Sequence, residues 1–243
     1  FDIDDVCLDF QILKEDAGAN QMEVLLVAAK KDMVNNHASL IRDAGFASSI
    51  IDVDSFAVQN CFEQGRGGTS ADSKRVVGLV NIGSDVTNIN IIQDASPHFT
   101  RDISIGSNNF AEIIQKAMGV DYEEAHAIVS GKLGERDPNA VKELIRQGAK
   151  DLSLGIERSV SFLKAAGDAD TIDEVVLSGG GARIPFLKDI LAEKHGMTIS
   201  IHNPLAGIEY EGNVFGEHEA EIDAIAPLLT VGIGLALRKA GRE

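Results

Sequence analysis

The stretch 75–92, RVVGLVNIGSDVTNINII, decides the fold of this chain. Two apolar, β-branched runs flank the turn sequence NIGSDVT at residues 81–87, and a third, more polar segment follows closely at 97–104. Such runs, separated by short polar segments, predict strands over 75–81, 86–93 and 97–104. Because the connections are too short for a crossover, we expect an antiparallel meander.

The turn between the first two strands has two interpretations. Gly83, Ser84 and Asp85 are ordinary turn residues and need no ligand to explain them. The same small residues also let backbone N–H groups approach an anion, and Ser84 and Thr87 add hydroxyl donors. This stretch alone leaves both interpretations open.

Three helices are predicted after the meander. The first begins near Asn109, with a capping box formed by Asn109 and Glu112. The second begins at Asp121, where the Asp-x-x-Glu spacing gives the same signal. The third has Asp137 as N-cap and Pro138 at its first position, and its apolar stripe extends to about residue 166.

Strands and helices then alternate to the end of the chain. We expect a buried strand at 174–177, a helix from Pro185 to His195, a strand at 197–201, an acidic loop at 208–223 and a buried helix at 225–237. From residue 75 the order is β-β-β-α-α-α-β-α-β-α. This order predicts an α/β fold with an RNase H-like core, in which helices flank a mixed sheet. That fold hosts both nucleases and nucleotide-binding lobes, so it does not choose a function.

The region before residue 75 predicts a smaller α/β unit. Strands are expected at 6–14, 21–30 and 46–53, and helices at 31–44, ending at Gly45, and at 55–64. Residues 65–74, GRGGTSADSK, have the composition of a flexible connection.

A second motif, SGGGAR at 178–183, lies between the buried strand and the helix that follows it. One glycine is enough for a tight strand-to-helix turn, and three in a row cost chain entropy. Their lack of side chains favours close approach of a flat ligand to the main chain, next to the positive end of the helix dipole.

Composition excludes several classes of protein. The net charge of -16 opposes binding to nucleic acid. The most apolar run, at 225–237, is shorter than the roughly 20 residues of a membrane-spanning helix, and no signal peptide is recognised. The six histidines show no metal-ligand spacing, and we interpret Cys7 and Cys61 as buried thiols in a reducing cytosol.

The two motifs together resemble those of the actin-like ATPase superfamily, in which a D-x-G-x-x-x-T hairpin is the second phosphate loop and a strand–GGGA–helix turn borders the adenosine. Within it the chain is most similar to the PilM family of type IV pilus assembly, which is related to FtsA. That likeness is carried by FDIDDVCLDFQIL, EVLLVAAKKDMV, AGFASSIIDVDSFAVQNCF and the NPL of residues 203–205. The resemblance covers nearly the whole chain, which corresponds to the C-terminal two-thirds of the family's length.

The resemblance implies a site and a domain organisation. The nucleotide-binding residues it implies are Asn81, Gly83, Ser84, Asp85, Thr87, Gly106, His126, Gly179, Gly180, Gly181, Ala182 and Arg183. Residues 1–54 correspond to part of a small subdomain inserted in lobe I, and 55–74 to a connecting helix and linker. Residues 75–243 correspond to lobe II with its C-terminal connecting helix, where Gly232 and Gly234 allow tight helix crossing. We expect the chain to be a fragment whose first phosphate loop precedes Phe1.

Two departures from the family pattern weaken the expected chemistry. Asn81 stands where the family has an aspartate that orients hydrated Mg²⁺, and an amide brings no negative charge for a metal. His126 and Val129 stand where the family often has an E-x-x-K pattern near the ribose and base. We therefore expect ATP as ligand, weakened Mg²⁺ handling, and weak or absent hydrolysis, with no catalytic residue and no protein-built metal site.

The resemblance also implies partners. These are the cytoplasmic N-terminal tail of the membrane protein PilN and the pilus motor ATPases, which would keep the protein in the cytoplasm at the inner membrane. The expected role is an ATP-binding scaffold, with homo-oligomers as a further state. The alternatives are an FtsA-like filament former and a sugar-kinase-like enzyme, for which we find no general base in a pocket-like context.

Overall fold

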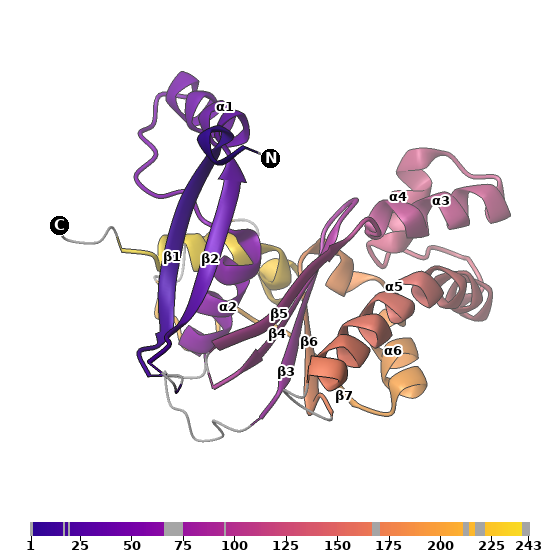
Figure 1. Ribbon diagram of the computed structural model, residues 1–243. Helices are drawn as coiled ribbons and strands as arrows, with labels where there is room; N and C mark the ends of the chain where they lie inside the picture. The colour runs from indigo at the N-terminus through magenta and orange to yellow at the C-terminus, as the bar shows by residue number, and fades with distance from the viewer. Residues whose placement is uncertain are drawn as a thin grey trace. The chain divides into compact units, whose positions relative to one another are not determined.

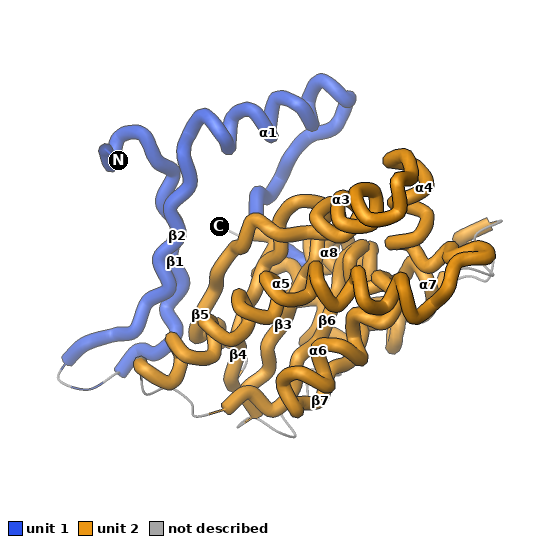
Figure 2. The backbone as a smooth tube through the Cα atoms, turned by 90° about the vertical axis from the view of Figure 1, so that its right-hand side faces the viewer, with its two compact units in different colours: residues 1–52, 238–243 blue, residues 53–237 orange. Residues whose placement is uncertain are grey.

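The computed structural model describes residues 2–16, 18, 20–65, 75–94, 96–166, 171–210, 214–216 and 222–239. The chain divides into two compact units, Phe1–Asp52 with Arg238–Glu243 and Val53–Leu237 (Figure 2). The expected connection at 65–74 and the acidic loop at 208–223 lie largely outside the described residues. None of the helices in the described ranges is long and apolar enough to cross a bilayer.

Unit 1 is a hairpin followed by a helix. A short 3-10 turn, Ile3–Asp5, precedes β1 (Val6–Lys14), which pairs antiparallel with β2 (Glu23–Lys30). Helix α1 (Lys31–Asp43) follows, and Gly45 ends it with a φ of +88°, a conformation that glycine adopts without strain. The strand predicted over 46–53 is wrong: this segment joins neither sheet, and among the described residues β1 and β2 pair only with each other.

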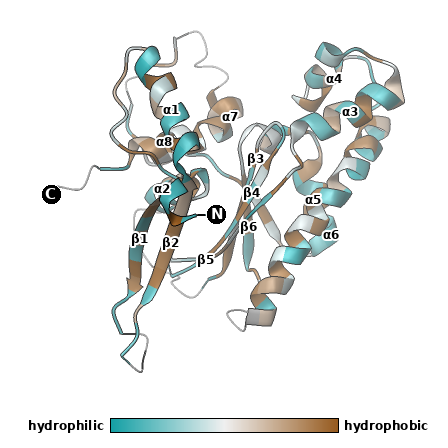
Figure 3. Cartoon of the chain, turned by 45° about the horizontal axis from the view of Figure 1, so that its top comes forward, coloured by the Kyte–Doolittle hydropathy of each residue, from teal (hydrophilic) through white to brown (hydrophobic). Residues whose placement is uncertain are grey.

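The hairpin has an apolar face that the described residues leave open. Alternate positions on the two strands place Leu8, Phe10, Ile12, Val24 and Leu26 on this face, with exposed fractions between 38% and 65%. Figure 3 shows the apolar colour of the two strands.

The two cysteines differ in environment. Cys7, on β1, is exposed, so its interpretation as a buried thiol is wrong, because its face of the two-stranded hairpin is not covered. Cys61 is buried, and this burial raises the pKa of its thiol to about 11.

Unit 2 is built on a five-stranded mixed sheet (Figure 1). Its order is β5-β4-β3-β6-β7, with β3 (Val77–Ile82), β4 (Thr87–Gln93) and β5 (Ser96–Ile103) antiparallel. Strands β6 (Glu174–Ser178) and β7 (Thr198–Ile201) run parallel to β3. The predicted meander is therefore confirmed.

Alternate residues of the strands face two separate cores. On one face, Val80, Ile82 and Ile89 pack with residues of α3 (Ser107–Met118), α4 (Tyr122–Val129), α5 (Pro138–Ala166) and α6 (Leu187–His195). On the other face, Val77, Leu79 and Val176 pack against α2 (Asp54–Gly65) and α8 (Thr230–Ala236). The two helical layers are visible on opposite sides of the sheet in Figure 1.

The helix predicted over 225–237 is not continuous. Helix α7 (Ile222–Ile225) leads into a 3-10 turn, Ala226–Leu229, and then into α8. Pro227 lies in that turn, and proline lacks the N–H that a continuous helix requires at this position. Within α8, Gly234 contacts the backbone of Ala57 on α2, whereas Gly232 has no atom within 4 Å of the position of an added Cβ.

The helix starts are partly as predicted. Asp121 caps α4 by accepting from the N–H of Glu124 at 2.8 Å, and α5 begins at Pro138. The predicted capping box at Asn109 and Glu112 is wrong, because the helix begins about one turn earlier. Helix α3 begins at Ser107, and Asn109 is its third residue, whose side chain accepts from the N–H of Gly106 at 2.7 Å.

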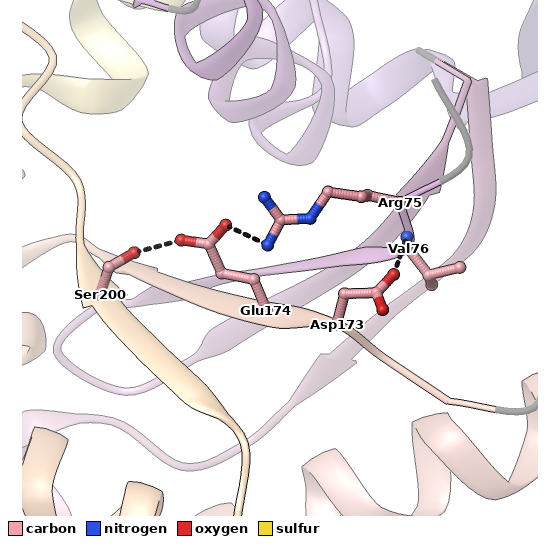
Figure 4. A network of polar contacts seen from close by, with 5 residues as sticks. All are labelled: Arg75, Val76, Asp173, Glu174 and Ser200. Carbon is pink, nitrogen blue, oxygen red and sulfur yellow. Dashed lines mark hydrogen bonds and ion pairs between the residues drawn. The ribbon is translucent and has the colours of Figure 1, made fainter. Parts of the chain in front are cut away.

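A polar network joins the amino ends of β3, β6 and β7 (Figure 4). The Glu174 carboxylate accepts from the hydroxyl of Ser200 at 2.9 Å and lies 3.5 Å from the Arg75 guanidinium. The neighbouring Asp173 accepts from the N–H of Val76 at 2.8 Å. This network fixes the register of the three strands at the end of the sheet opposite the NIGSDVT turn.

His202, which follows β7, gives unit 2 a pH-dependent stability. Its Nε2 is buried with no hydrogen-bond partner among the described residues, and burial lowers the pKa of the ring below 6.5. Its contribution to stability is therefore complete above pH 6.5 and is lost as the pH falls from there through the lower folded-state value.

We expect His202→Phe to reduce the loss of stability between pH 7.5 and pH 5.5, because phenylalanine keeps the ring contact with Phe62 and binds no proton. One proton contributes a slope of at most about 1.4 kcal/mol per pH unit. Urea unfolding followed by circular dichroism at several pH values measures this. Burial also lowers the pKa of His195, so the variant should keep part of the pH dependence of its stability. Equal slopes of unfolding free energy against pH for the two proteins would contradict the prediction.

Candidate functional site

The turn between β3 and β4 is held against the start of α3. The N–H of Gly83 donates to the carbonyl of Val86 and closes the hairpin. The N–H groups of Ser107 and Asn108 donate to the carbonyls of Gly83 and Ser84, both at 2.9 Å. Gly106 permits this approach, because a Cβ there would lie 2.6 Å from the backbone nitrogen of Asp85. Gly83 and Gly106 therefore shape the turn.

The tip of this turn has backbone N–H groups that make no hydrogen bond in the described part of the chain. Ser84, Asp85 and Val86 are exposed residues, and none of their N–H groups donates to any of the residues described. Successive unpaired N–H groups in a turn are the kind of donors that bind an anion. The Asp85 carboxylate is turned to its neighbours: it accepts from Asn108 Nδ2 at 2.8 Å and from Ser84 Oγ at 3.1 Å.

The hydroxyl of Thr87 has a structural role. Thr87 is fully buried, and its Oγ1 donates to the carbonyl of Ile105 at 2.7 Å. Its side chain therefore ties β4 to the segment before α3, and the anion donors at this turn are backbone groups. The sequence alone suggested a hydroxyl donor because threonine at a turn commonly exposes it.

The glycines of SGGGAR have different surroundings. A Cβ on Gly179 would lie 2.5 Å from the carbonyl oxygen of Ile82, and one on Gly181 would lie 2.7 Å from the Ile82 Cβ. These two glycines let the segment pack on the end of β3. Gly180 is exposed, and a Cβ there would have no atom within 4 Å. The two motifs, almost a hundred residues apart in sequence, are thus in contact, and Gly180 is the open position.

The expectation that the N-terminus of a helix lies directly behind the glycines is wrong. Residues Gly180–Arg183 form a 3-10 turn, and α6 begins only at Leu187, two residues after Pro185. Phe186 adopts a left-handed conformation with a φ of 65°, which separates the turn from the helix. Ala182 is buried in the core and Arg183 is half-buried at the end of the turn.

Asn81 is held in a hydrogen-bonded row across the sheet. Its Nδ2 donates to Asn88 Oδ1 at 3.0 Å, and its Oδ1 accepts from Ser178 Oγ at 3.2 Å. Asn88 Nδ2 in turn donates to Asp102 Oδ1 at 2.8 Å. Asn88 and Asp102 were not among the predicted site residues, although the polar residues at alternate positions of an otherwise buried strand, as in TNIN, are a detectable signal for Asn88.

His126 lies on α4, away from these two turns in sequence. Its ring contacts that of Tyr122 in a tilted arrangement with centroids 4.3 Å apart, and its Nε2 is buried without a partner in the described part of the chain. The structure brings the other motif residues together, but in the described part of the chain no hydrogen bond joins His126 to either turn.

The residues present fit a phosphate and do not fit a protein-oriented Mg²⁺. The donors at the turn are N–H groups, which bind anions. Asn81 is neutral, and both oxygens of Asp85 already accept hydrogen bonds. Among the described residues, no three histidine, cysteine or acidic side chains come close enough to hold a metal.

A mixed sheet of this order, with a donor-lined hairpin beside a glycine turn at the carboxyl ends of its strands, defines an actin-like fold. In agreement, MreB5 of Spiroplasma citri bound to AMPPNP matches with a TM-score of 0.58 at 14% identity, over 86% of this chain and 63% of that one. The ethanolamine utilization protein EutJ from Carboxydothermus hydrogenoformans matches with a TM-score of 0.61 at 16% identity, over 86% and 62%.

The chain belongs to the family of type IV pilus assembly protein PilM, whose model matches residues 1–240. A solved PilM–PilN type IV pilus biogenesis complex is similar with a TM-score of 0.81 and 22% identity. The match covers 99% of this chain and 68% of that one. The chain therefore spans between 62% and 68% of the lengths of these three proteins.

Proposed function

We propose that this chain is the nucleotide-holding part of a scaffold for type IV pilus assembly, which binds ATP weakly or in the full-length protein and has little or no hydrolytic activity. It links the tail of PilN to the pilus motor ATPases. The observation that carries the nucleotide assignment is the contact between the two motifs. The free amides of 84–86 and the open main chain at Gly180 belong to segments that meet at Ile82.

In this proposal the two segments have separate roles. The N–H groups of Ser84, Asp85 and Val86 hold a phosphate, and the exposed main chain at Gly180 packs against the flat base. Bound ATP supplies a negatively charged bridge between lobes. Hydrolysis is slow because Asn81 offers no carboxylate to orient a metal or activate water.

Unit 1 is the proposed site of partner binding. Its hairpin carries the open apolar face of Leu8, Phe10, Ile12, Val24 and Leu26. Contiguous exposed apolar surface of this kind marks interaction sites. The structural similarity to a PilM–PilN complex supports PilN as the partner, and binding to it would bring the protein to the inner membrane.

Gly180→Leu tests the nucleotide assignment. Its side chain enters open space, so we expect the unfolding free energy to change by less than about 1 kcal/mol, while ATP affinity falls at least about tenfold because the base loses its packing surface. Calorimetric titration of Mg-ATP into the full-length protein measures the affinity. Asp94→Gly, a change at a distant left-handed turn position, is the matched control and should bind like the unaltered protein.

The same variant tests the scaffold role. If ATP changes the conformation that binds PilN, the affinity for a synthetic PilN tail differs with and without ATP, and Gly180→Leu abolishes the difference. Equal tail affinities in the unaltered protein, under conditions where ATP binds, would contradict this role. Undiminished ATP binding by Gly180→Leu would contradict the proposed site.

A further inference from the structure

The row of side chains around Asn81 follows the register of the sheet. Asn81 lies opposite Ser178 on β6 and opposite Asn88 on β4, and Asn88 lies opposite Asp102 on β5. All four side chains therefore point to the same face, and each contacts the next. Ser178 is 1% exposed and Asn88 is 6% exposed, so the middle of the row is shielded from water, whereas Asp102 at its end is an exposed residue.

Asp102 determines which way the hydrogen bonds of this row run from donor to acceptor. A carboxylate only accepts hydrogen bonds, so Asn88 must turn its Nδ2 toward Asp102. Asn88 Oδ1 then faces Asn81, which must present its own Nδ2 to it. The Asn81 Oδ1 is left facing the Ser178 hydroxyl, which donates. Reversing any one amide would place acceptor against acceptor or donor against donor.

The orientation of the Asn81 amide determines which of its atoms can contact a ligand. Its oxygen is enclosed, because it accepts from Ser178 and because a Cβ on the neighbouring Gly179 would lie only 2.7 Å away. Its Nδ2 carries two hydrogens, of which the bond to Asn88 uses one. Asn81 is half-buried at the end of β3, and the hydrogen that remains is a donor at the edge where the turn amides lie.

We propose that Asp102, acting through Asn88, makes Asn81 a hydrogen-bond donor to a nucleotide phosphate, so that this site binds ATP without Mg²⁺. The inference rests on the proposed function. The Asn81 amide adds to the backbone N–H groups of 84–86 and stabilises the phosphate directly. Asp102 is thus a positioning residue that sets the metal requirement from two strands away.

Reversing the row tests the proposal. Asn81→Asp places a carboxylate oxygen against Asn88 Oδ1, and turning Asn88 would set its oxygen against Asp102, so we expect Tm to fall by about 5 °C. Asp102→Asn alone keeps the row intact, since an amide oxygen also accepts. Combined with Asn81→Asp, it lets Asn88 turn round and donate to position 81, which restores most of the lost Tm.

Metal dependence is the second measurement, made by titrating ATP into the full-length protein in Mg²⁺ and in EDTA. The unaltered protein is expected to bind with affinities within about threefold in the two conditions. The double variant is expected to bind at least about tenfold more tightly in Mg²⁺, because its carboxylate repels a bare phosphate. Ser104→Asp, which adds a charge on an exposed position near Asp102 outside the row, should behave like the unaltered protein.

The outcomes separate the two proposals. An absolute Mg²⁺ requirement in the unaltered protein would overturn this inference and leave the proposed function standing. Absence of ATP binding in both conditions would overturn the proposed function and this inference with it. Additive Tm changes at positions 81 and 102 would overturn the directed row itself, whatever the result with nucleotide.

Discussion

Replacing Gly234 by alanine is expected to force α8 away from α2 and to lower the free energy of unfolding of unit 2 by about 3 kcal/mol. The added Cβ would lie 2.5 Å from the carbonyl carbon of Ala57 and 3.0 Å from its Cα. These are backbone atoms of a buried helix, since Ala57 is 0% exposed, so no side-chain rotation relieves the overlap. One helix must move, and the packing of Val58 and Phe62 on the sheet is lost with it.

Gly232→Ala is the matched control on the same helix. Gly232 is exposed and a Cβ there meets no atom within 4 Å, so alanine should stabilise the helix by about 0.5 to 1 kcal/mol. Urea unfolding followed by circular dichroism compares the two variants, because the chain has no tryptophan for fluorescence. Equal stabilities would show that the close contact between α2 and α8 does not constrain the fold.

Gly106→Ala is the second change with a large expected effect, on both stability and ligand binding. Its Cβ would overlap the backbone of Ser84 and lie 2.6 Å from the nitrogen of Asp85. The turn would separate from the start of α3, and the two hydrogen bonds to the Gly83 and Ser84 carbonyls would be broken. We expect a loss of about 2 to 3 kcal/mol of stability and an ATP affinity at least about tenfold weaker, because the free amides lose their arrangement.

The control is Ser107→Ala, at the first residue of α3. Its backbone N–H still donates to Gly83, and no hydrogen bond of its side chain is found in the described structure. Stability and ATP affinity should stay close to those of the unaltered protein. If Gly106→Ala unfolds at the same urea concentration as this control, the turn tolerates a side chain at 106, and its docking on α3 is not what shapes the site.

Local sequence signals predicted most of the strands and helix starts correctly and failed at one strand. β-Branched runs and short turns predicted the meander, because they need only local hydrogen-bonding geometry. Asp121 and Pro138 marked two helix starts correctly, since caps are also local. The strand expected at 46–53 failed because a strand forms only where a neighbouring edge supplies partners, and no local pattern reports that edge.

The roles of individual glycines and polar side chains depended on contacts between distant segments. Three glycines in a row signalled a close approach, but only the position of Ile82 shows that Gly179 and Gly181 serve packing and that Gly180 is open. Thr87 looked like a ligand donor until the carbonyl of Ile105 accounted for its hydroxyl. Asn81 was recognised as a departure from a carboxylate, whereas its orientation follows from Asp102 on another strand.

The sequence by itself determined the order of the elements in the sheet-building part of the chain and the two motifs that meet at its edge, because strand, turn and cap preferences act over a few residues. The tertiary structure decided which donors remain free at that edge. Hydrogen bonds between neighbouring strands and close packing of backbones use up some groups and leave others, and both depend on residues up to a hundred positions apart.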